Sequence, residues 1–357
     1  MALAASLRAM QASFGLSDDA LASRAGLSVD RLRALLADGP ASSVELYHLA
    51  DTFGLEPGDL LKAARTRGVG ARFLRGDADL DAQDLPEADR RLLNRAQQAG
   101  RIGLQLWRLL RRGEPGYLRH VRPVGPPQGH AGEAGYVLGG ETREAFGHAP
   151  IVALQALIEG LGVHVARVTL TAPDVLGVSV VAADGLPVIL LNERTVRVRE
   201  PLKRRVVLAH ELCHLLHDGS VERPWHVLIS PAGLRDPVEA RANAFAPAFL
   251  APARGLDPQA SPDAIFQDLT TRWGLPPGCA AHYLHNLRGL DDAAIDRLAA
   301  TPASGAAFEP APAALALASD DQEVTPLVDG LIARLALDAA AAHEISAGRL
   351  AEILELG

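Results

Sequence analysis

The segment VVLAHELCHLLHD, at residues 206–218, carries two histidines and a glutamate at a spacing that suits a metal site. Its apolar residues recur at helical intervals, so His210 and His214 should lie one turn apart on the same helix face. Two imidazoles in that arrangement can bind one Zn²⁺, while Glu211 can act as a general base on a water molecule at the metal. Chance alone would produce such a pattern roughly 0.02 times in a chain of this composition. The pattern therefore predicts a zinc-dependent hydrolase.

A zinc site that acts on a substrate also needs a third protein ligand and an open position. The segment RDPVEARANAFAPAFLAP supplies Glu239, 25 residues after His214, near the start of a second predicted helix. Asn243 follows one turn later on the same face, so we expect it to contact one of the ligands. Under the alternative interpretation, the Glu239 carboxylate only satisfies backbone N–H groups at the N-terminus of this helix, beside Asp236.

His217 is the rival for the role of third ligand. It follows His214 by three residues but lies two turns, roughly 10 Å along the helix axis, from His210, which is too far for all three to share a metal. We therefore expect His217 to support the site or the fold without binding the metal. Cys213 lies inside the motif, where a buried free cysteine behaves as a small apolar residue. Two histidines and a glutamate accept either zinc or manganese, and we expect zinc.

Six segments occur in order between residues 146 and 290: APIVALQALIEGLGVHV, GVSVV, LPVILLN, RRVVLAHELCHLLH, EARANAFAPAFLAP and LTTRWGLPPGCAAHYLHNLRGL. Together they resemble the ImmA/IrrE family of zinc metallopeptidases. In that family the His-Glu-x-x-His residues and a downstream glutamate form the metal site. The resemblance assigns these roles to His210, Glu211, His214 and Glu239.

The resemblance also implies a substrate. Peptidases of this family cut a partner transcriptional repressor, usually itself of helix-turn-helix type, and so derepress genes of a stress or mobile-element response. Val206 stands where the family often has Phe, and Cys213 where it often has Gly, but neither departure removes a ligand or the base. Two alternatives stay open. One is a DNA-binding regulator whose zincin domain only senses or scaffolds, and the other is a toxin-type peptidase neutralised by an antitoxin.

Residues 1–70 read as short helices separated by turn signals. The segment LSDDALASRAGLSVDRLRALL, at residues 16–36, is a helix, a glycine turn and a second helix, and the unit resembles the XRE/Cro-type helix-turn-helix domain. Arg31 and Arg33 on the second helix are the candidate contacts to DNA or to a protein partner. The unit has seven basic and eight acidic residues, and Asp18 stands where that family usually offers an amide. DNA binding and protein docking therefore both stay open.

Residues 71–135 are predicted to form a basic helical connector followed by a Pro/Gly-rich linker. Between residues 90 and 122, nine arginines accompany a single acid, Glu114. Either these arginines only keep the connector solvated, or they form a basic surface for DNA or an acidic partner. Apolar residues at helical spacing predict one long helix or two over 86–112. The candidate buried residues there are Leu92, Leu93, Ile102, Leu106, Leu109 and Leu110.

Residues 136–295 carry the segments that resemble a metallopeptidase domain. Three runs rich in β-branched residues, at 163–170, 175–184 and 186–192, predict strands. The residues DGLP between the last two runs suit a hairpin turn, so we expect a small antiparallel sheet.

Residues 296–357 begin with an Ala/Pro-rich stretch of low complexity at 301–320, which predicts a flexible linker before two amphipathic helices. The predicted fold class is α+β. It comprises an N-terminal all-α helix-turn-helix domain, a helical connector, a zincin-like domain with a small antiparallel sheet and an HExxH helix, and a helical C-terminal tail.

The composition fits a globular protein of about two domains, with 357 residues, 48% of them hydrophobic and 22% charged. The two cysteines are too few for a disulfide framework or a thiolate zinc site and suit a reducing cytoplasm. No uncharged apolar stretch approaches the roughly 18 residues of a membrane span, so we expect a cytoplasmic protein without a membrane partner.

Overall fold

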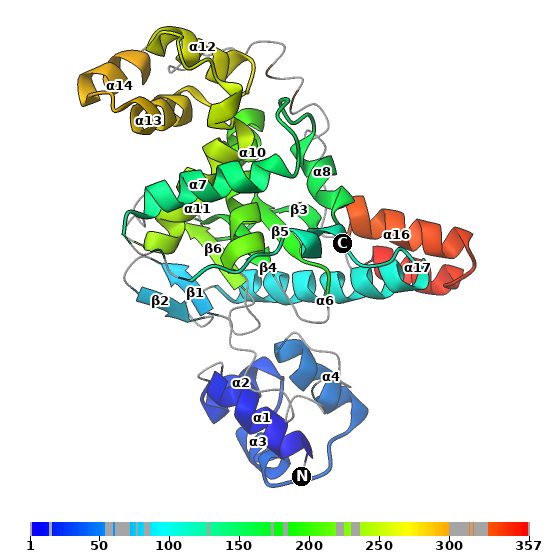
Figure 1. Ribbon diagram of the computed structural model, residues 1–357. Helices are drawn as coiled ribbons and strands as arrows, with labels where there is room; N and C mark the ends of the chain where they lie inside the picture. Colours follow the sequence, from blue (N-terminus) through cyan, green and yellow to red (C-terminus); the bar gives the residue numbers. More distant parts are fainter. Residues whose placement is uncertain are drawn as a thin grey trace.

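The described part of the computed structural model comprises four N-terminal helices and a larger α+β unit built on one mixed sheet (Figure 1). It describes residues 2–13, 16–53, 60, 72–75, 78–81, 86–125, 127, 129–172, 175–180, 185–218, 225–229, 236–299, 314, 317 and 328–355. The predicted α+β class is confirmed. Among the helices described, none is both long and apolar enough to span a bilayer.

The N-terminal unit contains α1 (Ala2–Ser13), α2 (Asp18–Arg24), α3 (Val29–Leu36) and α4 (Ser43–Thr52). Ser17 and Ser28 cap α2 and α3, because each hydroxyl accepts a hydrogen bond from a backbone N–H in the first turn. Gly26 has a φ of +64°, the left-handed conformation that the turn between α2 and α3 requires. A further helix expected over 57–61 lies outside the described residues except for Leu60, which is buried in the same core.

The sheet of the larger unit has the strand order β3-β5-β4-β6. The antiparallel pair β4–β5 agrees with the predicted hairpin, but β3 and β5 run parallel, so the expectation of a purely antiparallel sheet is wrong. Strand β5 lies between β3 and β4, and these two strands run in opposite directions. A strand that is antiparallel to β4 in this position is therefore parallel to β3. The sequence also gave no sign of the edge strand β6. The bounds are β3 (His164–Val168), β4 (Val175–Val180), β5 (Val188–Asn192) and β6 (Trp225–Ile229).

Both faces of the sheet are covered. Ile189 and Leu191 of β5 pack into one core with α8 (Leu154–Gly160), α10 (Pro201–Cys213) and α11 (Pro237–Leu250). Val188 and Leu190 point to the other face, where α6 (Glu87–Leu109), α16 (Gly330–Ala341) and α17 (Ala347–Leu354) share a second core (Figure 1). The basic connector and the C-terminal helices therefore belong to the same packed unit as the sheet.

The Arg-rich connector forms one helix, α6. Leu93, Ile102 and Leu106 are buried as expected, and Leu92 and Leu110 are partly buried. Leu109 is 40% exposed, contrary to the expectation, because it lies in the last turn of the helix.

The Ala/Pro-rich stretch 301–320 falls outside the described residues except for Ala314 and Leu317, and both are buried. The buried guanidinium of Arg205 donates hydrogen bonds of 2.6 Å to the Leu317 carbonyl and of 2.9 Å to the Ile151 carbonyl. The Ala153 N–H donates to the same Leu317 oxygen. At this point the predicted flexible linker is fixed to the larger unit.

The remaining elements flank these layers. Helix α7 packs against α11, and α12 to α14 follow α11 at the top of Figure 1. The hairpin β1–β2 precedes α6. Their bounds are β1 (Arg72–Arg75), β2 (Ala78–Asp81), η3 (Gly116–Arg119), α7 (Ala131–Glu144), α9 (Val196–Arg199), η4 (His214–Asp218), η6 (Ala253–Gly255), α12 (Pro262–Thr271), α13 (Pro277–Arg288) and α14 (Asp292–Ala299).

Candidate metal centre

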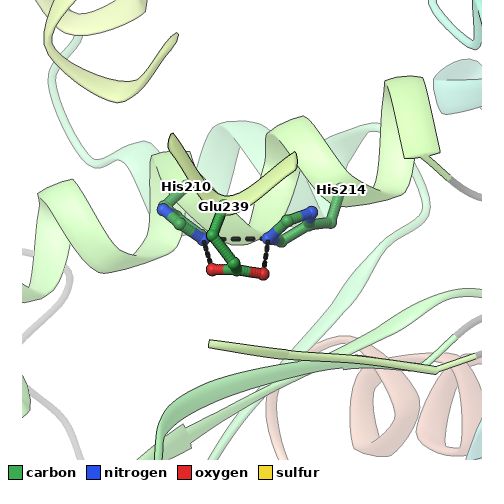
Figure 2. A group of neighbouring side chains, drawn as sticks. All are labelled: His210, His214 and Glu239. Atoms are coloured by element: carbon green, nitrogen blue, oxygen red, sulfur yellow. Dashed lines mark hydrogen bonds and ion pairs between the residues drawn. The ribbon is translucent and has the colours of Figure 1, made fainter. Parts of the chain in front are cut away.

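Helix α10 brings the two motif histidines together. His210 lies in its last turn, and His214 opens the π-helical turn η4 that continues the helix. The two Nε2 atoms are 2.9 Å apart, and the rings meet edge to face at a centroid distance of 4.7 Å (Figure 2). Both residues are buried, so the pair is held inside the fold.

Helix α11 adds Glu239 to this pair. Its carboxylate oxygens lie 3.2 Å from Nε2 of His210 and 3.2 Å from Nε2 of His214 (Figure 2). The N-cap of α11 is Asp236, whose side chain accepts a 2.7 Å hydrogen bond from Val238 N–H. Because Asp236 caps the helix, the carboxylate of Glu239 is free to face the two histidines.

The hydrogen-bond partners of the two imidazoles indicate that His210, His214 and Glu239 can bind a cation. Nδ1 of His210 lies 3.0 Å from Asn243 Oδ1, and Nδ1 of His214 lies 2.8 Å from Asp218 Oδ2. Both partner oxygens are acceptors, so each Nδ1 carries a hydrogen, and each ring in its neutral form presents a lone pair on Nε2. Two lone pairs and a carboxylate then converge in a buried space, which is unfavourable without a positive charge between them.

The burial of Glu239 supports the same conclusion. The residue is 4% exposed, and neither carboxylate oxygen has a hydrogen-bond partner among the described residues. The ligand atoms of His210, His214 and Glu239 all lie within 4.8 Å of one another. Two nitrogens and one carboxylate are a ligand set that binds zinc with a position left open, and the same set also binds manganese.

The charges of the site agree with a metal-binding role. Burial disfavours an ionised Glu239, but the neighbouring His214 and His210 outweigh it and hold its pKa below the usual range. Burial lowers the pKa of His210. Burial acts in the same direction on His214, but Glu239 and Asp218 outweigh it and raise its pKa. The site thus holds an ionised carboxylate beside two imidazoles, and a divalent cation bound there would replace the proton that His214 otherwise attracts.

A second layer of side chains orients the histidines. Asn243 contacts His210, as the sequence led us to expect. Asp218 contacts His214 through one oxygen and Arg241 through the other, and Arg241 also donates a 2.7 Å hydrogen bond to the Gly125 carbonyl. Partners of this kind fix the ring orientation of metal-binding histidines. Neither Asp218 nor Arg241 was predicted from the sequence, although Asp218 follows His214 by one helical turn.

His217 lies away from the three converging ligand atoms. Its Nε2 is 3.0 Å from Thr142 Oγ1, and its Nδ1 is 3.0 Å from the Arg122 carbonyl. The backbone N–H groups of Arg122 and Val124 donate to the carbonyls of Leu216 and His217 at the end of the π-helical turn. His217 therefore connects residues 122–124 to the end of the helix that carries His210 and His214.

Helix α7 packs closely along α11, the helix that carries Glu239. Gly135 and Gly139 face α11 so closely that a Cβ on Gly135 would come 2.7 Å from the Ala244 Cβ. A Cβ on Gly139 would come 2.6 Å from the Phe245 backbone oxygen. Small residues one helical turn apart allow this close approach, which fixes the helix that carries Glu239.

Glu211 is fully buried beside the metal-site residues. Burial raises its pKa to about 8, although His214 and a hydrogen bond from Ser179 act in the opposite direction. Its Oε1 has no hydrogen-bond partner among the described residues. The side chain thus offers one free carboxylate oxygen, as a general base requires.

The N-terminal candidates Arg31 and Arg33 are engaged within their own helical unit. Arg31 binds both carboxylate oxygens of Glu45 at 2.6 and 2.9 Å and so joins α3 to α4. Arg33 lies 3.5 Å from Asp18 and 3.7 Å from Asp30. Both guanidinium groups therefore have acidic neighbours in this structure.

Residues 158–285 match the family of IrrE N-terminal-like domains, Peptidase_M78. The matched stretch contains the whole sheet, α10 and α11, and hence His210, His214 and Glu239. It does not reach the N-terminal helices. Searches among curated proteins and among solved structures gave no match. The chain thus carries a metallopeptidase domain with a buried His-His-Glu site.

Proposed function

We propose that the protein is a zinc-dependent endopeptidase that cleaves a partner helix-turn-helix repressor and so derepresses stress or mobile-element genes. The observation that carries the peptidase part is the buried site of His210, His214 and Glu239 within a domain of peptidase family type. The proposed substrate is supported by the resemblance to ImmA/IrrE peptidases and by the two helices α2 and α3, which a short turn joins in the same chain.

The residues of the site have three different roles in the proposed peptide hydrolysis: they hold the metal, orient its ligands and transfer a proton. His210, His214 and Glu239 would hold the zinc ion, and Asn243 and Asp218 orient the two imidazoles. Bound zinc supplies Lewis-acid chemistry, which polarises the scissile carbonyl and activates water. Glu211 takes a proton from the attacking water and passes it to the nitrogen of the leaving amine.

The N-terminal unit is proposed to bring the peptidase to its target and not to act as a strong operator binder. Its net charge is −1, and Asp18 at the start of α2 would repel a phosphate. Arg31 and Arg33 already have carboxylate neighbours, so phosphate binding would have to displace them. DNA binding through the Arg-rich residues 90–122 would then be salt-sensitive and largely independent of sequence.

We also place the protein in the cytoplasm, where its proposed substrate acts on DNA. Both cysteines are free, and Cys213 is buried beside the metal-site residues. Free thiols are the usual state in a reducing compartment.

The test incubates the zinc-loaded full-length protein, wild type or Glu211→Gln, with purified helix-turn-helix regulators encoded near its gene. We expect the wild type to cut one of them at a defined bond. Glu211→Gln should retain zinc and lose hydrolysis by about 10²–10⁴-fold. Equal cleavage by both proteins would reject Glu211 as the base.

A second arm measures binding of the full-length protein to operator DNA. Metal-dependent operator binding without cleavage of any regulator would favour a sensor that regulates DNA directly. Nanomolar binding at physiological salt, with about 10³-fold or greater discrimination against random DNA, would contradict the proposed role of the N-terminal unit.

A further inference from the structure

Strand β4 lies next to Glu211 and presents two small residues to it. Gly177 and Ser179 are two positions apart, so both belong to the same face of the strand. Ser179 Oγ lies 2.6 Å from Glu211 Oε2 and 3.0 Å from the backbone oxygen of the same residue. Ser179 is fully buried, so its hydroxyl has no competition from solvent.

We infer that Ser179 positions the catalytic base Glu211, and that Gly177 provides the space in which this carboxylate sits. This inference rests on the proposed peptidase function, in which Glu211 is the base. Because Ser179 holds Oε2, the carboxylate cannot rotate freely, and Oε1 is the oxygen without a hydrogen bond among the described residues. Oε1 is therefore the atom that accepts the proton of the attacking water and later releases it to the amine.

The two distances from Ser179 Oγ indicate how its single hydrogen is used. A hydroxyl has one hydrogen to donate, and we assign it to Oε2 of Glu211, because this contact of 2.6 Å is the shorter of the two. The longer contact to the Glu211 carbonyl remains as an alternative acceptor when the side chain moves. The hydroxyl thus stays satisfied in a buried position while it favours the productive orientation of the carboxylate.

The backbone conformation at position 177 does not require a glycine. Its φ is not among the positive values that favour glycine in the described part of the chain. A Cβ built there would come 2.8 Å from Glu211 Oε1, 3.0 Å from its Cγ and 3.1 Å from its Cδ. Because the three nearest atoms all belong to Glu211, the space at Gly177 serves that side chain.

The kinetic test uses the zinc-loaded full-length protein and a library of quenched fluorogenic peptides. Ser179→Ala should lower kcat by about 10- to 100-fold, as loss of an orienting partner does elsewhere, with KM and zinc content unchanged. Ser179→Thr keeps the hydroxyl and should restore much of the rate. Gly177→Ala should lower kcat because its methyl group displaces Oε1.

Ser261→Ala is the matched control. Its hydroxyl also makes one local hydrogen bond, which it accepts from the Ala264 N–H at the N-cap of α12, but it belongs to no part of the site. It should leave kcat unchanged. A wild-type kcat in Ser179→Ala, or an equal loss in Ser261→Ala, would overturn the inference.

A second measurement does not depend on turnover. Urea unfolding of the metal-free wild type, Ser179→Ala, Glu211→Gln and the double variant gives a double-mutant cycle. Non-additive effects are expected if the hydroxyl holds the carboxylate, and additive effects would overturn the inference. Failure of the proposed function looks different, because the zinc-loaded wild type itself would then show no cleavage, whereas the unfolding cycle would still report the contact between Ser179 and Glu211.

Discussion

Replacing Asp218 by asparagine removes one charge behind the metal site while it keeps the shape of the side chain. Asp218 joins His214 to Arg241, and the side chains of Asp218 and Arg241 are only 5% and 3% exposed. Loss of such an orienting partner lowers metal affinity by about 10- to 100-fold, which corresponds to about 1.4–2.7 kcal/mol. We expect zinc binding by Asp218→Asn to weaken within this range.

The same substitution should also destabilise the protein without metal. Breaking a buried ion pair costs about 3–5 kcal/mol, because the remaining charge stays buried without its partner. Arg241 keeps its hydrogen bond to the Gly125 carbonyl, and the asparagine oxygen can still accept one hydrogen bond. We therefore expect a loss near the lower limit, about 3 kcal/mol in the free energy of unfolding.

Two assays separate these effects: competition with a chelator gives the zinc affinity, and urea unfolding of the metal-free protein gives its stability. The control is Asp338→Asn, which removes the carboxylate of a surface ion pair with Arg112. The side chain of Asp338 is 51% exposed and that of Arg112 is 41% exposed. That change should cost less than about 1 kcal/mol and leave zinc affinity unaltered. Wild-type zinc affinity in Asp218→Asn would refute the idea that Asp218 orients His214.

Three further predictions concern the third ligand, the helix that carries it and the N-terminal unit. Glu239→Ala should lose stable zinc binding because two histidines alone leave the cation under-coordinated, and full zinc content by elemental analysis would assign the third ligand elsewhere. Gly139→Ala should destabilise the fold by about 1–3 kcal/mol in urea unfolding, because its methyl group meets the backbone of α11. Gly140 lies on the same helix with open space around it, so Gly140→Ala should raise the free energy of unfolding by up to about 1 kcal/mol. Equal changes in the free energy of unfolding for Gly139→Ala and Gly140→Ala would contradict the close packing of α7 on α11. Hydrogen bonding to Arg31 lowers the pKa of Glu45 from 4.5 to about 2, so the stability of α4 relative to Glu45→Gln should be fully present above pH 4.5 and lost as the pH falls towards 2. The measurement compares hydrogen-exchange protection factors of α4 in the two proteins, and a ratio that stays constant over this pH range would contradict the prediction.

The three residues of the candidate metal site were predictable because their signals are local. His210 and His214 are set by helical spacing, and Glu239 lies in the first turn of a helix with a recognisable N-terminal cap. Asp218 has the same kind of signal, since it follows His214 by one turn. Arg241 and Ser179 could not be found in this way, because their contacts depend on how separate elements pack.

The sheet shows the same limit at the level of the fold. The strand runs themselves and the hairpin of β4 and β5 follow from residue types, which act locally. The parallel pairing of β3 with β5 depends on which position in the sheet each strand takes, and that is decided by long-range packing. Helices α6 and α16 could be predicted as amphipathic, but their shared partner surface lies on strands far away in the sequence.

Counting charges along the sequence predicted the net charge of the N-terminal unit but not its ion pairs. The sum over residues 1–70 showed that the N-terminal unit is nearly neutral. It did not show that Arg31 is bound by Glu45 from the next helix, because ion pairing between helices requires the tertiary arrangement. Arg31 thus turns from a candidate contact into a connection between α3 and α4.

The second face of the sheet is covered by one helix that precedes the strands and by another near the C-terminus. During synthesis, α6 emerges early, but α16 leaves the ribosome only after the complete HExxH segment and its third ligand have been made. Contacts between such distant parts of a chain form slowly and leave apolar surface exposed in the meantime. We therefore expect nascent chains that end before residue 330 to lack a finished core, so that the sheet is covered on both faces only after α16 has been made.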